Sequence, residues 1–180
     1  SAPPRGKMIL NDSGEPIYGP KDDADLAKVA ELGLPFWLAG GYATPDKVVE
    51  ALAAGAAGVQ VGTLFAMAAE SGLTPELRAR LVSELAADTL VVRNDPRASP
   101  TGFPFKVAEL SNTLSDEQNY QARERICDLG YLRSPVERAD GSIAYRCASE
   151  PVHMYLRKGG SEEELAGRKC LCNALMANIG

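Results

Sequence analysis

The chain has 180 residues, which is the size of one ordinary domain or of a domain with a small appendage. Apolar residues make up 45% and charged residues 24%, and these average values exclude a disordered chain, a collagen and a disulfide-dense miniprotein. The formal net charge of −5 argues against a broad surface for nucleic acid or for anionic lipid, so neither partner is expected.

The chain begins with an irregular stretch and a first helix. Residues 1–20 are rich in proline and glycine, but two apolar patches, 7–10 and 15–18, flank the turn sequence Asn-Asp-Ser-Gly and predict a short hairpin. Apolar residues spaced three and four apart predict a helix over 22–32. Gly33 is expected to end this helix in a left-handed conformation.

A strand–helix–strand unit follows. Residues 34–39 form a continuous apolar run, which is typical of a parallel strand covered on both faces. A cap residue followed by proline predicts a helix over 45–54, then a second strand over 58–61 and a further helix over 64–70. Because parallel strands need a crossover of about a dozen residues or more, usually helical, the two strands are expected to pair in parallel.

Residues 51–69 carry no formal charge and approach the ~20 residues of a membrane span. Three glycines interrupt this stretch and alanine dominates it, so two short elements joined by a turn are expected instead of a span. The first eight residues also lack the apolar core of a secretory signal. We therefore expect no membrane contact and a cytoplasmic location.

The second half of the chain is expected to contain more helix than strand. A cap, a proline and an acid in order predict a helix over 75–88, followed by a short strand at 90–92 and a loop over 94–105. Residues 108–180 are expected to be mostly helical and to pack against the first part, because their content of large aliphatic residues is low. Helices are predicted there over 116–127, 162–169 and 171–178, with a turn at Gly141.

Glycines follow both predicted parallel strands. Gly40 and Gly41 follow the first strand, and Gly62 and Thr63 follow the second, one strand–helix–strand repeat later. Glycine lets backbone N–H groups approach a ligand oxygen, and the next helix directs its positive end to the same place. In an eight-stranded β/α barrel, the loops after strands 7 and 8 form the recurrent phosphate site. Either pair alone is typical of a tight turn, but the paired occurrence favours phosphate binding.

The same residues carry a resemblance to a known family. Residues 39–44 (Ala-Gly-Gly-Tyr-Ala-Thr), 51–63 (ending Val-Gln-Val-Gly-Thr) and 70–71 are similar to the nitronate monooxygenase (2-nitropropane dioxygenase-like) family. The close match covers about residues 20–72, and Ser-Pro-Thr-Gly at 99–102 is a weaker similarity. The family consists of FMN-dependent β/α barrels. The resemblance implies that the FMN phosphate is bound by Gly40, Gly41, Gly62 and Thr63. It also implies that Gln60 and Val61 contact FMN.

The resemblance also implies what this chain does not contain. The catalytic histidine of the family lies in a Gly-Gly-His segment that is expected upstream of residues 1–6, and no such segment is present. His153, the single histidine, lies outside the barrel pattern and is interpreted as a surface or packed residue. We therefore assign no catalytic residue. The expected fold is α/β: residues 1–107 form the last βα units of a TIM (β/α)8 barrel, and residues 108–180 form a cysteine-containing helical extension.

The function that the resemblance implies is the FMN-dependent oxidation of alkyl nitronates with O₂. This chain would supply the part that binds the FMN phosphate, would need the upstream part of the same polypeptide, and would be inactive alone. One alternative is an FMN-dependent enoyl-thioester reductase on the same type of barrel. Another alternative is a non-catalytic fragment that binds a metal or a partner protein.

Four cysteines lie in the last third of the chain. The Cys-x-Cys spacing of Cys170 and Cys172 is tighter than the usual zinc spacing, and Cys127 and Cys147 lie far before them. Reduced thiols are the favoured interpretation in a reducing compartment, and no metal ligand is assigned. A four-thiolate metal or redox site is the alternative.

Overall fold

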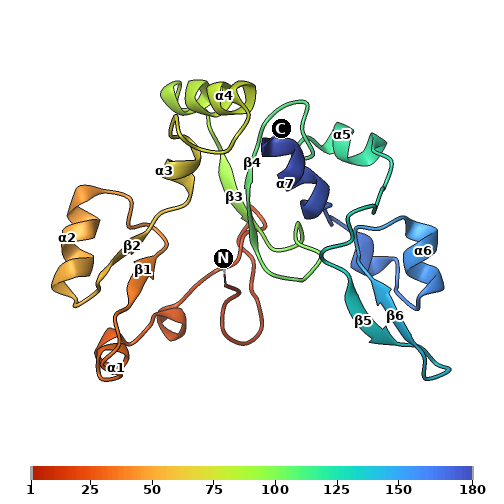
Figure 1. The fold of residues 1–180 in the computed structure, drawn as a ribbon, viewed down its shortest axis with the longest axis horizontal. Coiled ribbons are helices and arrows are strands. Elements are labelled where there is room, and N and C mark those ends of the chain that lie inside the picture. Colours follow the sequence, from red (N-terminus) through yellow and green to blue (C-terminus); the bar gives the residue numbers. More distant parts are fainter. Residues whose placement is uncertain (1, 180) are drawn as a thin grey trace. The chain divides into compact units, whose positions relative to one another are not determined.

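The computed structural model describes residues 2–179 and divides into two compact units (Figure 1). One unit comprises residues 19–83, and the other comprises the described residues of 1–18 and 84–180. Both contain short helices and two-stranded sheets, so the predicted mixture of helix and strand is confirmed. Residues 2–179 do not themselves close a barrel. The predicted division at residue 107 concerns which part belongs to a barrel, and it stays a prediction.

The strand–helix–strand unit is confirmed within residues 19–83. Strands β1 (Trp37–Ala39) and β2 (Gly58–Gln60) pair in parallel, and helix α2 (Pro45–Ala53) makes the crossover between them. The register aligns Ala39 with Gln60, so the two strands end together. Both strands are shorter than predicted.

The first helix of this unit is shorter than the sequence pattern predicts. A single 3₁₀ turn, η1 (Pro20–Asp22), is followed by α1 (Leu26–Ala30) in place of one helix over 22–32. The reason is the side chain of Asp25, which accepts a hydrogen bond from the Lys28 N–H at 3.3 Å and caps a new helix start. Gly33 has the expected left-handed conformation, with φ of +65°.

The uncharged stretch 51–69 is divided among the end of α2, strand β2 and a single helical turn, α3 (Thr63–Ala66). The expectation of short elements in place of a span is therefore confirmed. Within residues 2–179, no helix combines the length and the apolar character that crossing a bilayer demands. Helix α4 (Pro75–Ala86) follows close to its predicted bounds.

The second unit is organised around an antiparallel pair. Strand β3 (Val92–Asp95) pairs with β4 (Phe105–Ala108), and the predicted hairpin near the amino terminus is confirmed as a bridge between Leu10 and Pro16. The predicted strand at 90–92 begins two residues later than expected. Strand β4 was not predicted, because the prolines and glycine just before it dominate the local pattern.

The region after β4 is less helical than predicted. A β-hairpin of β5 (Ser134–Glu137) and β6 (Ile143–Arg146) lies at its centre, with the predicted turn at Gly141 between the strands. The alternating, half-exposed residues of these strands give too short a pattern to recognise. The helical elements of this region are α5 (Glu117–Ala122), α6 (Val152–Arg157), the 3₁₀ turn η2 (Glu163–Leu165) and α7 (Leu171–Ile179).

Candidate cofactor phosphate site

The candidate site lies where the carboxyl ends of the two parallel strands meet. Because Ala39 and Gln60 are register partners, Gly40 and Val61 leave the sheet side by side, at the carboxyl ends of the two strands. Figure 1 shows this part of the fold, with α2 following β1 and α3 following β2. The two glycine segments therefore begin from neighbouring positions, as the parallel pairing predicted.

Gly40 and Gly41 need to be glycine for conformational reasons. Both have φ of +91°, a region that side-chain-bearing residues rarely adopt. A Cβ atom built on either residue would meet no heavy atom within 4 Å, and the same holds for Gly62. The backbone at these positions is therefore open to a ligand and is not packed against the rest of the unit.

The helix starts beside these glycines have no side-chain cap. Thr44 is the N-cap residue of α2, yet its hydroxyl makes no capping hydrogen bond. Gly62 is the N-cap of α3 and has no side chain to offer, so the N–H groups of Thr63 and its neighbours lack the usual cap. Uncapped N–H groups at two adjacent loops are the donors that a phosphate oxygen accepts from.

The fit to a phosphate rests on neutral donors. The nearest sequence cation is Lys47 in the first turn of α2, and its ammonium donates to the Glu50 carboxylate at 2.6 Å. This hydrogen bond raises the pKa of Lys47, while the pair stays fully exposed. The acidic Asp46 in the same turn also offsets the positive end of the helix. Backbone N–H groups and the Thr63 hydroxyl are thus the groups suited to a phosphate here.

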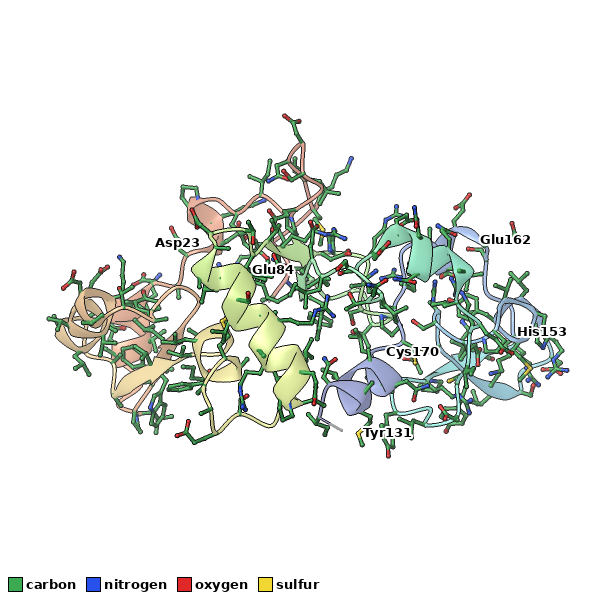
Figure 2. All side chains as sticks on the ribbon, turned by 90° about the horizontal axis from the view of Figure 1, so that it is seen from above. Asp23, Glu84, Tyr131, His153, Glu162 and Cys170 are labelled. Atoms are coloured by element: carbon green, nitrogen blue, oxygen red, sulfur yellow. The ribbon has the colours of Figure 1, made fainter. Side chains whose placement is uncertain are left out.

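The structure brings the six predicted residues together on one unit. All of them lie between the end of β1 and the start of α3, and only Val61 is partly buried while the others are exposed: Gly40, Gly41, Gln60, Gly62 and Thr63. Their role in binding FMN stays a prediction. His153 lies in the other unit, on α6, where its side chain is exposed (Figure 2).

The loop predicted over 94–105 is confirmed as the connection between β3 and β4, and hydrogen bonds order it. Between β3 and β4, Ser99 is 4% exposed and its backbone oxygen accepts from the Arg168 guanidinium at 2.6 Å. Asp95, also buried, accepts from the N–H groups of Arg97 and Ala98 at 2.8 and 3.1 Å. These bonds order residues 95–99, the first half of the loop. The Arg168 contact spans 69 residues of sequence, so no local pattern could have revealed it.

A profile of the family described as nitronate monooxygenase matches residues 23–119, which is more than half of the chain. The chain belongs to the nitronate monooxygenase family. The resemblance drawn from the glycine segments is therefore confirmed. No curated protein and no solved structure matches the chain.

Membership in the nitronate monooxygenase family carries general properties. The family is in general flavin-dependent, and its fold is in general a TIM barrel, of which residues 2–179 contain a single parallel strand pair. The matched range begins before α1, includes both glycine segments and ends within α5. Residues 120–180, which contain the four cysteines, lie outside the match.

Proposed function

We propose that this chain supplies the FMN phosphate-binding part of an enzyme that oxidises alkyl nitronates with O₂. The proposal rests on the carboxyl ends of β1 and β2, which lie side by side because Ala39 and Gln60 are register partners. A glycine segment with open space around it follows each strand, and both segments lie inside the family match. When bound, FMN supplies the redox chemistry. The chain's own residues hold its phosphate end and so fix where the flavin lies.

The proposed roles follow from the donors available. The backbone N–H groups at Gly40 and Gly41 and those at Gly62 and Thr63 would donate hydrogen bonds to the phosphate, and the Thr63 hydroxyl would add a further donor. Gln60 ends β2 and Val61 follows it, and both would contact the cofactor next to its phosphate. The catalytic histidine is assigned to a part of the enzyme outside this chain.

We propose further that the other strands of the barrel come from an upstream part of the same polypeptide. In support, β1 and β2 form a two-stranded sheet whose outer edges have no strand partner among residues 2–179. Trp37 on β1 is 54% exposed, and unpaired parallel edges with bare apolar side chains are unfavourable in water. Residues 1–107 then belong to the barrel and residues 108–180 to an extension. A reducing cytoplasm suits the four free thiols.

The phosphate site is tested with two matched glycine variants in the polypeptide that contains this chain. Gly41 and Gly55 have nearly the same φ, +91° and +88°, and open space around both. Gly55 precedes β2 and so lies at the opposite end of that strand. Gly41→Ala should lower FMN affinity about tenfold or more, which corresponds to about 1.4 kcal/mol. Gly55→Ala should leave FMN affinity unchanged while straining the backbone similarly. An equal loss in both variants contradicts the site.

The reaction is tested on the flavin-loaded enzyme. Under anaerobic conditions, propionate 3-nitronate should bleach the flavin absorbance, and O₂ should restore it. Flavin that NADH reduces and the nitronate does not would instead favour the enoyl-thioester reductase. A polypeptide with no flavin absorbance, even after FMN is added, would overturn the proposed function.

A further inference from the structure

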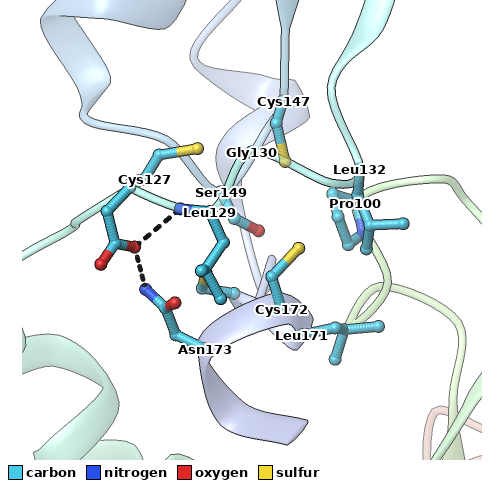
Figure 3. Close-up of a pocket in the computed structure, with 12 residues that line it drawn as sticks. Pro100, Cys127, Leu129, Gly130, Leu132, Cys147, Ser149, Leu171, Cys172 and Asn173 are labelled. Carbon is cyan, nitrogen blue, oxygen red and sulfur yellow. Dashed lines mark hydrogen bonds between the residues drawn. The ribbon is translucent and has the colours of Figure 1, made fainter. Parts of the chain in front are cut away.

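Four cysteines from three segments that are distant in sequence line one small cavity. Cys127 follows α5, Cys147 follows β6, and Cys170 and Cys172 lie at the start of α7. The cavity has a volume of about 10 Å³, which is room for one water molecule or a bare metal ion. Figure 3 shows Cys127, Cys147 and Cys172 approaching it from three separate segments of the chain. All four are free cysteines.

Cys147 is buried, and Cys127, Cys170 and Cys172 are partly buried. Burial raises the pKa of Cys147 and of Cys170 above the ordinary value of 9.0.

Further bonds hold the cysteine-bearing segments against one another. Asp128 accepts from the side-chain amide of Asn173 at 2.9 Å and from the Leu129 N–H at 2.9 Å, which joins the Cys127 loop to α7 (Figure 3). The Ser149 hydroxyl donates to the Lys169 carbonyl at 2.7 Å, which joins the Cys147 turn to the residue before Cys170. The cavity is therefore braced by contacts that do not involve the sulfur atoms.

The surrounding region has little apolar core of its own. Its buried hydrophobic cluster consists of Ala148, Tyr155 and Leu165, and its other large buried apolar side chains are Leu110, Tyr120 and Leu171. Small regions with so few buried apolar side chains commonly depend on disulfides or a structural metal for stability. The four cysteines are unpaired, so a metal is the cross-link that remains available.

We propose that Cys127, Cys147, Cys170 and Cys172 together bind one soft divalent metal ion as four thiolates, with Zn²⁺ as the expected ion. Thiolate sulfur is the ligand that zinc prefers in structural sites, at about 2.3 Å. Across residues 2–179, no three cysteine, histidine, aspartate or glutamate side chains already have metal-binding geometry. Binding therefore requires the thiols to rotate toward the cavity.

The charge balance of this site is explicit. Four thiols each lose a proton when they bind Zn²⁺, so the site gains a net charge of −2 and its affinity rises with pH. Arg133 lies beside Cys127, donates to its carbonyl at 2.8 Å and offsets part of this charge. Asp128 opposes it from the same loop. The proposed site lies outside the family match and does not depend on FMN binding.

The test begins with metal analysis of the full chain, purified without a histidine tag. We expect one zinc ion per chain, released by an organomercurial that titrates four thiols. Cys147→Ser and Cys172→Ser should each lose zinc affinity by about 100-fold or more. His153→Ala is the matched control, because an exposed histidine is the usual source of adventitious metal, and it should retain the full metal content.

A second measurement does not depend on variants that fold. Co²⁺ in place of zinc should give the intense visible bands of a tetrahedral site and the sulfur charge-transfer bands of a thiolate site. Iron that the cysteine variants lose and the histidine variant keeps supports the same four-thiolate site with another metal. A chain that binds neither zinc, cobalt nor iron stoichiometrically, or that contains a disulfide by mass, overturns the proposal.

Discussion

At the scale of single residues, Glu150 is the most unusual side chain in the described chain. It is 0% exposed, and one carboxylate oxygen accepts from the Lys158 ammonium at 2.6 Å, with the Arg133 guanidinium 4.0 Å away. The other carboxylate oxygen has no hydrogen-bond partner. A buried carboxylate is tolerated because a cation lies next to it, so the cation is the sensitive partner.

Lys158→Met should lower the free energy of unfolding by about 3 kcal/mol, because it leaves Glu150 buried without its closest counter-ion. Replacing both residues, in Glu150→Gln with Lys158→Met, should recover part of that loss. The exposed pair of Lys28 and Asp25, 3.5 Å apart, provides the control, and Lys28→Met should change stability by less than about 1 kcal/mol. Urea unfolding measures all three, and similar losses for both lysines would contradict the argument.

Cys147 gives the metal-free chain a pH-dependent stability. Burial raises the pKa of its thiol above 9.0, so the folded state holds this proton more tightly than the unfolded state. The stability that the neutral thiol provides is complete below pH 9.0 and is lost as the pH rises through the higher folded pKa. In Cys147→Ser, whose hydroxyl does not titrate there, the alkaline loss of stability should be smaller. Thermal unfolding temperatures measured against pH test this difference. The same alkaline slope in the variant and in the unaltered chain would contradict the role of Cys147.

At the scale of elements, two glycines show that the free-energy cost of replacing glycine by alanine depends on the neighbouring side chains. A Cβ on Gly160 would lie 2.1 Å from the ring of Tyr155, which is 4% exposed and donates to Glu164 at 3.0 Å. A Cβ on Gly58 would lie 3.1 Å from Trp37, its register partner across the parallel pair. The Trp37 ring is half exposed and free to move aside, whereas the Tyr155 ring is confined.

Gly160→Ala should therefore lower the free energy of unfolding by about 1–3 kcal/mol, because the new Cβ would push the confined Tyr155 ring out of its packed position. Gly58→Ala should cost less than about 1 kcal/mol, because a half-exposed ring yields and alanine is better suited to a strand than glycine. Chemical denaturation of the two variants measures the difference. A larger loss for Gly58→Ala than for Gly160→Ala would contradict the argument that the Trp37 ring is free to move.

At the scale of the whole molecule, residues 19–83 leave much apolar surface exposed. Ala51, Ala56 and Leu81 are buried, but many other large apolar side chains are not. Those more than half exposed are Leu32, Leu34, Trp37, Val49, Leu52, Leu64 and Phe65. A parallel sheet is normally covered on both faces. This exposure is the physical reason for proposing that further barrel strands cover the pair.

Trp37, the single tryptophan of the chain, reports on that cover. In the chain by itself, acrylamide should quench its fluorescence strongly, because 54% of the side chain is exposed. In a polypeptide extended at the amino end, quenching of this tryptophan should fall and its emission should shift to shorter wavelength. Subtracting the signal of Trp37→Phe isolates it from added tryptophans. Equal quenching in both forms would contradict a covering role for the upstream strands.

The sequence by itself determined the local architecture around the candidate phosphate site. Proline at the first helical position, glycines after short apolar runs and the spacing of one repeat were sufficient to predict β1, α2 and β2 and their parallel pairing, because these signals act within a few residues. The same local signals carried the family resemblance. They did not predict β4 or the β5–β6 hairpin, whose short strands are defined by their partners.

Only the tertiary structure decided what lies together across long separations in sequence. Cys127, Cys147 and Cys172 line one cavity, and Arg168 orders the loop at Ser99, although nothing in their spacing marks them as neighbours. The physical reason is that these contacts join segments far apart in sequence, and folding alone brings such segments together. A sequence pattern records periodicity and caps, but it does not record which distant segments meet.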